Sequence, residues 1–194
     1  SKFGFSIETG DAEKAIEQLM KIDSLNLLGL HFHLGSPIFE LEPYSEAIDY
    51  VYDFAAQMRD KYGLEMKEFS PGGGFAIGYE VDKQPLPIAD YAKVIGDSIK
   101  KSCDTHDFSI PKVILEPGRA LVGRSGISIY RIGSIKTIPG VRNYVSVDGG
   151  MGDNIRPALY GSDYSVFSVT KTLETANRMK STISGKFCES GDYL

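Results

Sequence analysis

The chain has 194 residues, of which 42% are hydrophobic and 24% are charged, the composition of a globular protein with one or two domains. A formal net charge of −5 argues against a nucleic-acid or anionic-membrane surface as the main function. No apolar run reaches the roughly 20 residues of a membrane span, and the first residues do not form a signal peptide. The two cysteines, Cys103 and Cys188, form neither a disulfide framework nor a zinc set. We therefore expect a cytoplasmic protein with neither a nucleic-acid nor a membrane partner.

Four short apolar runs in the first 120 residues predict β-strands. They lie at 2–6, 27–33, 67–70 and 112–116, and the last two are typical of buried strands.

Amphipathic stretches separate these runs and predict three helices. Apolar residues recur at helical spacing over 11–22 and over 47–62, where Gly63 is a C-cap, and again after Pro87. Because strands and helices alternate, we expect a parallel sheet, either in a barrel or in an open doubly wound fold.

The pattern changes near Arg124, where β-rich segments begin to follow one another without helices. These segments lie at 127–138, 143–148, 163–171 and 179–185, and 172–178 could form a helical turn or two. We predict a second, mainly antiparallel β-domain over 125–194, after an α/β domain over 1–124. Four parallel strands are too few for a closed barrel of eight, so we expect a fragment of a larger protein.

Three predicted strands end in glycine beside polar side chains, and such strand ends bind ligands in parallel βα folds. The three ends read His31-Phe-His33-Leu-Gly-Ser36, Pro71-Gly72-Gly73-Gly74 and Glu116-Pro-Gly118-Arg119.

Each of these ends has a purely structural explanation as well as a functional one. The glycines of Gly72–Gly74 either present amides to an anion or form a tight turn, and they match no dinucleotide or P-loop fingerprint. His31 and His33 face one side of a strand but have no third ligand near them, so we predict no metal site. Glu116 and Arg119 either neutralise each other or bind a heterocyclic nitrogen and an anion.

Two further motifs lie in the β-rich part. In Asp-Gly-Gly-Met-Gly-Asp-Asn-Ile-Arg156-Pro-Ala-Leu-Tyr160, a surface loop explains the glycines, whereas Arg156 and Tyr160 have the spacing to hold a carboxylate. In Phe-Cys188-Glu189-Ser-Gly-Asp, the cysteine is either a small hydrophobic residue or a proton-transfer group.

Five motifs in this order resemble the diaminopimelate decarboxylase family, whose members are alanine-racemase-like, fold type III pyridoxal-phosphate decarboxylases. The motifs are HFHLGS, SPGGGFAIGY, EPGRALVG, DGGMGDNIRPALYG and GKFCESGDYL, and they cover essentially the whole chain. The resemblance implies part of a TIM-type (β/α)8 barrel followed by a β-domain. It also implies conversion of meso-2,6-diaminopimelate to L-lysine and carbon dioxide with pyridoxal 5'-phosphate.

The resemblance implies cofactor-binding roles for the strand-end residues. The His33 imidazole would stack on the cofactor ring and take part in catalysis, and Glu116 would keep the pyridine nitrogen protonated. The other cofactor-binding residues would be Ser36 and the amides of Gly72, Gly73 and Gly74, which contact the phosphate, together with Gly118 and Arg119.

The resemblance also implies substrate-binding roles. Arg119, Arg156 and Tyr160 would bind the distal end of the substrate, and Glu189 its distal ammonium. Cys188 would be the catalytic proton donor after carbon dioxide leaves. In this family Cys188 and Glu189 act on the neighbouring subunit's cofactor, which implies a homodimer with shared active sites.

One family motif is absent from the chain. The Schiff-base lysine of the family lies in a Tyr-Ala-x-Lys-Ala-Asn-like motif, and neither Lys2 nor Lys112 has matching neighbours. We therefore expect an amino-terminal portion of the protein to lie outside this chain.

Three alternatives remain open. One is a related ornithine, arginine or carboxynorspermidine decarboxylase, another is a non-catalytic homologue that binds without chemistry, and the third is a phosphosugar-binding barrel. The Cys-Glu-Ser-Gly-Asp and Arg-Pro-Ala-Leu-Tyr motifs favour diaminopimelate, because its second carboxylate needs a cationic partner.

Overall fold

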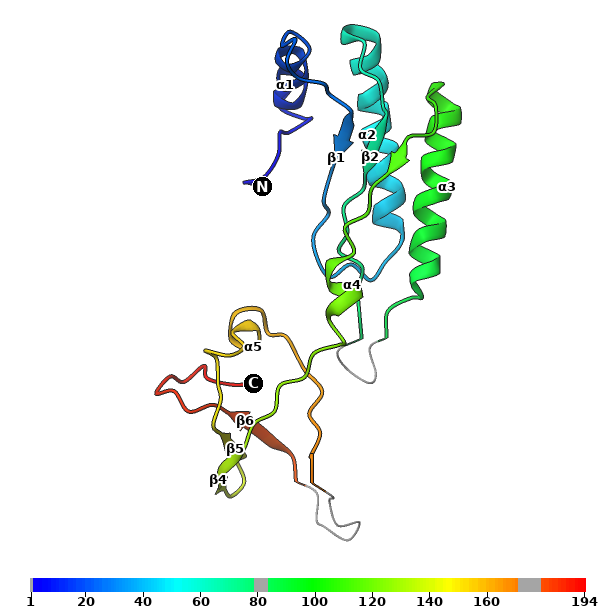
Figure 1. Cartoon of the computed structure of the whole chain (residues 1–194). Coiled ribbons are helices and arrows are strands. Elements are labelled where there is room, and N and C mark those ends of the chain that lie inside the picture. The colour runs from blue at the N-terminus through cyan, green and yellow to red at the C-terminus, as the bar shows by residue number, and fades with distance from the viewer. Residues whose placement is uncertain (1, 79–83, 171–178) are drawn as a thin grey trace. The chain divides into compact units, whose positions relative to one another are not determined.

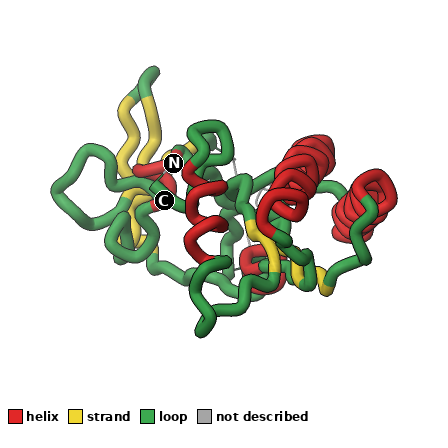
Figure 2. Tube along the Cα trace, turned by 90° about the horizontal axis from the view of Figure 1, so that it is seen from above, coloured by secondary structure: helices red, strands yellow, loops and turns green. Residues whose placement is uncertain are grey.

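The computed structural model describes residues 2–78, 84–170 and 179–194. The chain forms two compact units, one made of residues up to Ile77 together with Pro85–Arg124, the other mainly of Ser125–Leu194 (Figure 1). Helix dominates the first unit, whereas strand and loop dominate the second (Figure 2). Every helix among the described residues is too short or too polar to span a membrane.

The first unit contains a parallel three-stranded sheet, as predicted. Its strands are β1 (Gly29–His31), β2 (Glu68–Ser70) and β3 (Lys112–Val113), in the order β1-β2-β3. Gly29 pairs with Glu68 on one side of β2, and Glu68 pairs with Lys112 on the other. The carboxyl ends of the three strands therefore lie at one edge, and all three strands are shorter than their apolar runs.

Three helices accompany this sheet: α1 (Asp11–Leu19), α2 (Glu42–Tyr62) and α3 (Ile88–His106). Gly63 ends α2 with a φ of 77°, which confirms the predicted C-cap, because glycine adopts left-handed backbone without a Cβ clash. Pro87 precedes α3, as its fixed φ and missing N–H predict.

The core of the first unit lies between the helices and the sheet. Helices α2 and α3 run side by side and pack against each other (Figure 1). Phe69 of β2 is fully buried, and its ring centroid lies 5.0 Å from that of Tyr52 on α2. The other fully or almost fully buried apolar side chains of the two helices are Tyr44, Ile48, Ala55, Met58, Tyr91, Ile95, Ile99 and Cys103.

The second unit contains a mixed sheet rather than the predicted mainly antiparallel one. Strand β4 (Ile132–Ile138) pairs antiparallel with β5 (Arg142–Val147), and β5 pairs parallel with β6 (Ser181–Ser184). A short turn joins β4 to β5, which forces them antiparallel. The long connection from β5 to β6 lets the chain return in the same direction.

Two short helices were not predicted, namely α4 (Gly118–Val122) in the first unit and α5 (Arg156–Tyr160) in the second. Five residues are too few to show helical periodicity. Their end signals were present, however: Pro117 precedes α4, and Gly161 follows α5 with a φ of 59°.

Four predicted strands are wrong in whole or in part. The strand predicted over 127–138 begins only at Ile132, where pairing with β5 begins. No strand forms at 2–6 or at 163–170, because a strand needs hydrogen-bonded neighbours, and within the described ranges none pairs with these segments. The strand predicted as buried at 112–116 is exposed, since β3 is an edge of the described sheet. The predicted helical turn at 172–178 lies outside the described residues.

Candidate active site

The loops that follow β1, β2 and β3 are joined by backbone hydrogen bonds at the carboxyl edge of the sheet. Gly73 forms an isolated parallel bridge with Glu116, and Ile38 forms another with Phe75. The Glu116 amide donates to the Gly72 carbonyl at 2.9 Å, and the Ile38 amide donates to the Gly74 carbonyl at 2.8 Å. The structure thus places the strand-end residues of the first unit together around the glycine turn.

The glycine turn has no room for side chains. A Cβ on Gly73 would lie 1.7 Å from the Glu116 carbonyl oxygen. A Cβ on Gly72, whose φ is +73°, would lie 2.6 Å from the Phe32 carbonyl oxygen. The close approach of the three loops therefore requires these glycines even without a ligand, as the tight-turn explanation expects. Their contact with a phosphate stays a prediction.

His33 lies beside this turn. The Gly73 amide donates to its Nδ1 at 3.5 Å, so Nδ1 is the acceptor of the ring. The amide of Gly72 donates at 3.3 Å to the Ser70 hydroxyl. Ser36 is exposed in the loop after β1, directly before Pro37.

Tyr44 is a residue that the sequence analysis missed. Its hydroxyl donates a 2.7 Å hydrogen bond to the Gly73 carbonyl, and its side chain is completely buried against the rings of Phe75 and Tyr91. Burial raises the pKa of Tyr44 to about 12, so the hydroxyl remains a donor at physiological pH. The sequence signal was weak, because a tyrosine early in an amphipathic helix is commonly a core residue.

Glu116 pairs with His31 across the sheet edge. The Nε2 atom of His31 lies 3.2 Å from Oε2 of Glu116, and the two side chains are 52% and 54% exposed. His31 and His33 therefore contact different partners. Among the described residues no three His, Cys, Asp or Glu side chains are grouped to hold a metal ion.

Gly118 and Arg119 begin α4, directly after the loop that carries Glu116. The turn of this helix is closed by the Gly123 amide, which donates to the Arg119 carbonyl at 2.8 Å. Arg119 is half-buried in the first turn of α4, and the loop just before α4 is joined to the glycine turn by the bridge between Glu116 and Gly73.

In the second unit, α5 brings Arg156 and Tyr160 together. The guanidinium carbon of Arg156 lies 5.0 Å from the centre of the Tyr160 ring, a cation–π distance, and its Nη2 donates to the Ser162 hydroxyl at 3.4 Å. The Nε atom is buried and has no hydrogen-bond partner within the described part of the chain. A buried donor without a partner is costly, so this guanidinium can still take an acceptor.

Cys188 and Glu189 lie on the turn after β6. Cys188 is exposed, and the Glu189 carboxylate accepts from the Ser190 hydroxyl at 3.1 Å and from the Gly191 amide at 3.3 Å. Asp192, which the sequence analysis did not select, is buried directly behind this turn. The only sequence signal was its position in the Cys-Glu-Ser-Gly-Asp motif.

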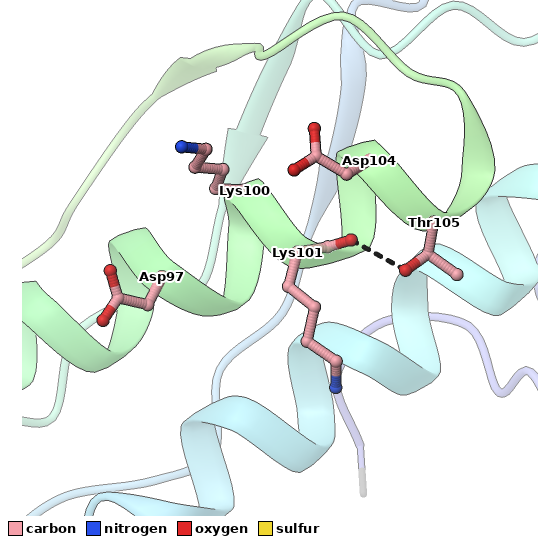
Figure 3. Close-up of a pocket in the computed structure, with 5 residues that line it drawn as sticks. All are labelled: Asp97, Lys100, Lys101, Asp104 and Thr105. Carbon is pink, nitrogen blue, oxygen red and sulfur yellow. Dashed lines mark hydrogen bonds between the residues drawn. The ribbon is translucent and has the colours of Figure 1, made fainter.

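A shallow hollow on α3 contains none of the predicted site residues (Figure 3). Its lining consists of Asp97, Lys100, Lys101, Asp104 and Thr105, all from one helix. The Thr105 hydroxyl donates to the Lys101 carbonyl at 2.8 Å within that helix. We interpret the hollow as a solvated helix surface.

Comparisons with known proteins show the family to which the chain belongs. Residues 1–123 match the family described as "Pyridoxal-dependent decarboxylase, pyridoxal binding domain". The whole chain is 43% identical to a diaminopimelate decarboxylase of Bacillus subtilis and 39% identical to one of Staphylococcus aureus, and covers 44% and 45% of their lengths. The chain therefore spans less than half of these relatives.

Solved structures give the same result. The crystal structure of diaminopimelate decarboxylase from M. jannaschii in co-complex with L-lysine matches the whole chain with 33% identity and a TM-score of 0.86, and the match covers 43% of that protein. A lysine/ornithine decarboxylase from Vibrio vulnificus matches with a TM-score of 0.82 and 22% identity, over 49% of its length, which shows a shared fold alone.

Proposed function

The chain belongs to the pyridoxal-dependent decarboxylases, and from this premise we propose that the full-length protein converts meso-2,6-diaminopimelate to L-lysine and carbon dioxide. The observation that carries this proposal is the match of all 194 residues to diaminopimelate decarboxylases, at 43% identity for the relative from Bacillus subtilis. The Cys-Glu-Ser-Gly-Asp and Arg-Pro-Ala-Leu-Tyr motifs lie within the matched region.

The residues at the carboxyl edge of the parallel sheet fit pyridoxal phosphate chemically. They supply an imidazole (His33), a hydroxyl (Ser36), a carboxylate (Glu116) and a guanidinium (Arg119), which suit an aromatic ring, a phosphate and a ring nitrogen. The backbone amides of Gly72–Gly74 suit the phosphate, which would replace the long hydrogen bonds that Gly72 and Gly73 donate to Ser70 and His33. When bound, pyridoxal phosphate supplies an electron sink for the pair left by the departing carboxylate. Glu116 supports this chemistry if its carboxylate holds the ring nitrogen protonated.

The residues of the second unit fit the distal end of the substrate and its reacting carbon. The guanidinium of Arg156 binds the distal carboxylate with Tyr160 beside it, and the Glu189 carboxylate binds the distal ammonium. The Cys188 thiol returns a proton to the carbon from which carbon dioxide has left. The partnerless Nε of Arg156 and the exposure of Cys188 support these roles.

We propose that the first unit is part of a TIM-type (β/α)8 barrel and that the second is part of the carboxyl-terminal β-domain. The parallel order β1-β2-β3 with its helices supports the barrel. The Schiff-base lysine then lies in the remainder of the full-length protein. Lys112 does not fill that role, because its Nζ pairs with Glu68 at 3.0 Å at the start of the strands.

We also propose a cytoplasmic homodimer in which Cys188 and Glu189 serve the neighbouring subunit's site. Large apolar side chains exposed in the second unit support an interface between subunits. They include Ile127, Ile129, Val141 and Phe167, which are 86%, 69%, 77% and 78% exposed.

The test uses the full-length protein with added pyridoxal phosphate. Its near-ultraviolet and visible spectrum is recorded, meso-diaminopimelate is added, and lysine and carbon dioxide are measured. A cofactor absorption band and equal amounts of lysine and carbon dioxide are expected. Turnover of ornithine or arginine instead would assign a sister decarboxylase, and a folded protein without a cofactor band would be a non-catalytic homologue.

A further inference from the structure

We infer that Asp192 is a positioning residue, which holds the Cys188–Glu189 turn and the loop leading to Arg156 in one arrangement. The inference rests on the proposed function, because it assigns a role behind the proposed proton donor and substrate ligands. Asp192 is only 3% exposed, so we assign it no direct contact with the substrate.

The Asp192 carboxylate accepts one hydrogen bond from each of two loops. Its Oδ1 accepts from the Met151 amide at 2.5 Å, and its Oδ2 accepts from the Phe187 amide at 2.7 Å. Phe187 directly precedes Cys188, and Met151 belongs to the loop that continues to Arg156. One side chain therefore joins the two chain segments that carry the proposed substrate contacts.

Backbone contacts bring the same two segments together around this carboxylate. The Lys186 amide donates to the Gly149 carbonyl at 2.9 Å, and the Gly185 amide donates to the Asp192 carbonyl at 2.8 Å. A Cβ on Gly185 would lie 2.2 Å from Asp192 Oδ2, and one on Gly150 would lie 2.6 Å from Oδ1. The two glycines leave the space that the carboxylate occupies.

A carboxylate is the side chain that this position requires. Both of its oxygens face N–H donors, so an asparagine would place its NH2 group against one of them and lose that hydrogen bond. Asp153 provides a matched control, because its Oδ2 accepts a hydrogen bond from the Gly150 amide at 2.9 Å, and asparagine can accept that bond equally well.

The experiment compares Asp192→Asn and Asp153→Asn in the full-length holoenzyme. For Asp192→Asn we expect kcat to fall at least about 10-fold and KM for diaminopimelate to rise, because small displacements of reacting groups cost up to about 100-fold in rate. The cofactor absorption band should be unchanged, since Asp192 has no role in cofactor binding. Asp153→Asn should stay within about twofold of wild type in both constants.

A double variant separates positioning from general damage. If Asp192 acts through Cys188, Asp192→Asn combined with Cys188→Ala has a kcat no lower than Cys188→Ala alone. The inference would be overturned if the kcat losses of the two single variants multiplied in the double variant. It would also be overturned by an Asp192→Asn enzyme with wild-type kcat and KM. A wild-type protein that makes no lysine overturns the proposed function as well, and a fully active Cys188→Ala overturns the role of that thiol.

A measurement on the wild-type holoenzyme covers the case in which Asp192→Asn does not fold. Hydrogen exchange at the amides of Met151 and Phe187 should be at least about 100-fold slower than in an unstructured peptide, because both donate to a buried carboxylate. Exchange of either amide at the peptide rate would overturn the inference without any variant.

Discussion

Nε2 of His31 lies 3.2 Å from Oε2 of Glu116, although the two residues are 85 positions apart in the chain. His31 ends β1 and Glu116 lies on the loop after β3, and β2 is the strand between β1 and β3, so the contact reaches across the carboxyl edge of the sheet. Glu116 is the proposed partner of the cofactor's ring nitrogen, and in this proposal the contact with His31 orients its carboxylate.

Glu116→Gln in the full-length protein should lower the rate of lysine formation at least about 100-fold, the scale of a lost acid–base group. His31→Gln should cost less than about 10-fold, because it removes an orienting contact and leaves the carboxylate in place. Initial rates at saturating pyridoxal phosphate measure both effects. A Glu116→Gln enzyme within threefold of wild type would falsify the assignment.

Gly73→Ala should destabilise the full-length protein by more than about 2 kcal/mol, because the new Cβ would lie 1.7 Å from the Glu116 carbonyl oxygen. The matched control is Gly96→Ala on an exposed turn of α3, where a Cβ meets nothing within 4 Å. This change should stabilise by about 0.5–1 kcal/mol through helix propensity. Denaturant unfolding measures the change in the free energy of unfolding for both variants. A change of the same sign in the two variants would contradict the described turn.

Tyr44→Phe should cost about 1 kcal/mol at neutral pH, since the Gly73 carbonyl loses its 2.7 Å donor. Burial raises the folded-state pKa of Tyr44 to about 12, above its ordinary value of 10.0. The stability that this shift contributes is present below pH 10 and is lost as the pH rises toward 12. The variant should therefore lose less stability than wild type between these pH values. Tyr50→Phe, a change on an exposed position of α2, is the control for the loss at neutral pH and should cost almost nothing there.

Asp49→Asn should weaken the contact between α2 and α3. The Asp49 carboxylate accepts from Lys101 Nζ at 2.9 Å and from the Ser102 hydroxyl at 2.8 Å, and the Lys101 hydrogen bond holds its pKa below 3.8. The pair is largely solvent-exposed, so the loss at pH 7 should not exceed about 1 kcal/mol.

A lowered pKa in the folded state gives stability above pH 3.8 that is lost as the pH falls through the folded-state value. The difference in the free energy of unfolding between wild type and Asp49→Asn should therefore shrink below pH 3.8. Asp97→Asn, which removes a carboxylate paired within α3 with Lys93, is the control. An unchanged difference from pH 7 to pH 3 would contradict the prediction.

The sequence predicted those parts of the fold that depend on local patterns. Gly63 and Pro87 marked helix ends because their backbone preferences are local, and β2 was visible as a buried apolar run. The absence of a strand at 2–6 and the direction of β6 could not be predicted, because both depend on which distant strand is available for pairing. The helix α5 was too short to give a periodic signal.

The candidate site was predictable as a set of residue types and not as a set of contacts. The strand-end glycines, His33 and Glu116 stood out in the sequence, and the structure gathers them around one turn. The partners of these residues did not stand out. Tyr44 resembles a core residue and Asp192 a loop carboxylate until the backbone groups that they bind are known.

β2 is the central strand of the parallel sheet, so its position sets the distance between the strand ends of β1 and β3. Phe69 pairs with Leu30 on one side and with Val113 on the other, and its ring packs edge to face against the ring of Tyr52. A one-residue insertion in β2 would reverse the faces of its side chains and displace both neighbouring strand ends at once. Tolerance of insertions should accordingly be lowest in this strand, where no proposed ligand contact lies.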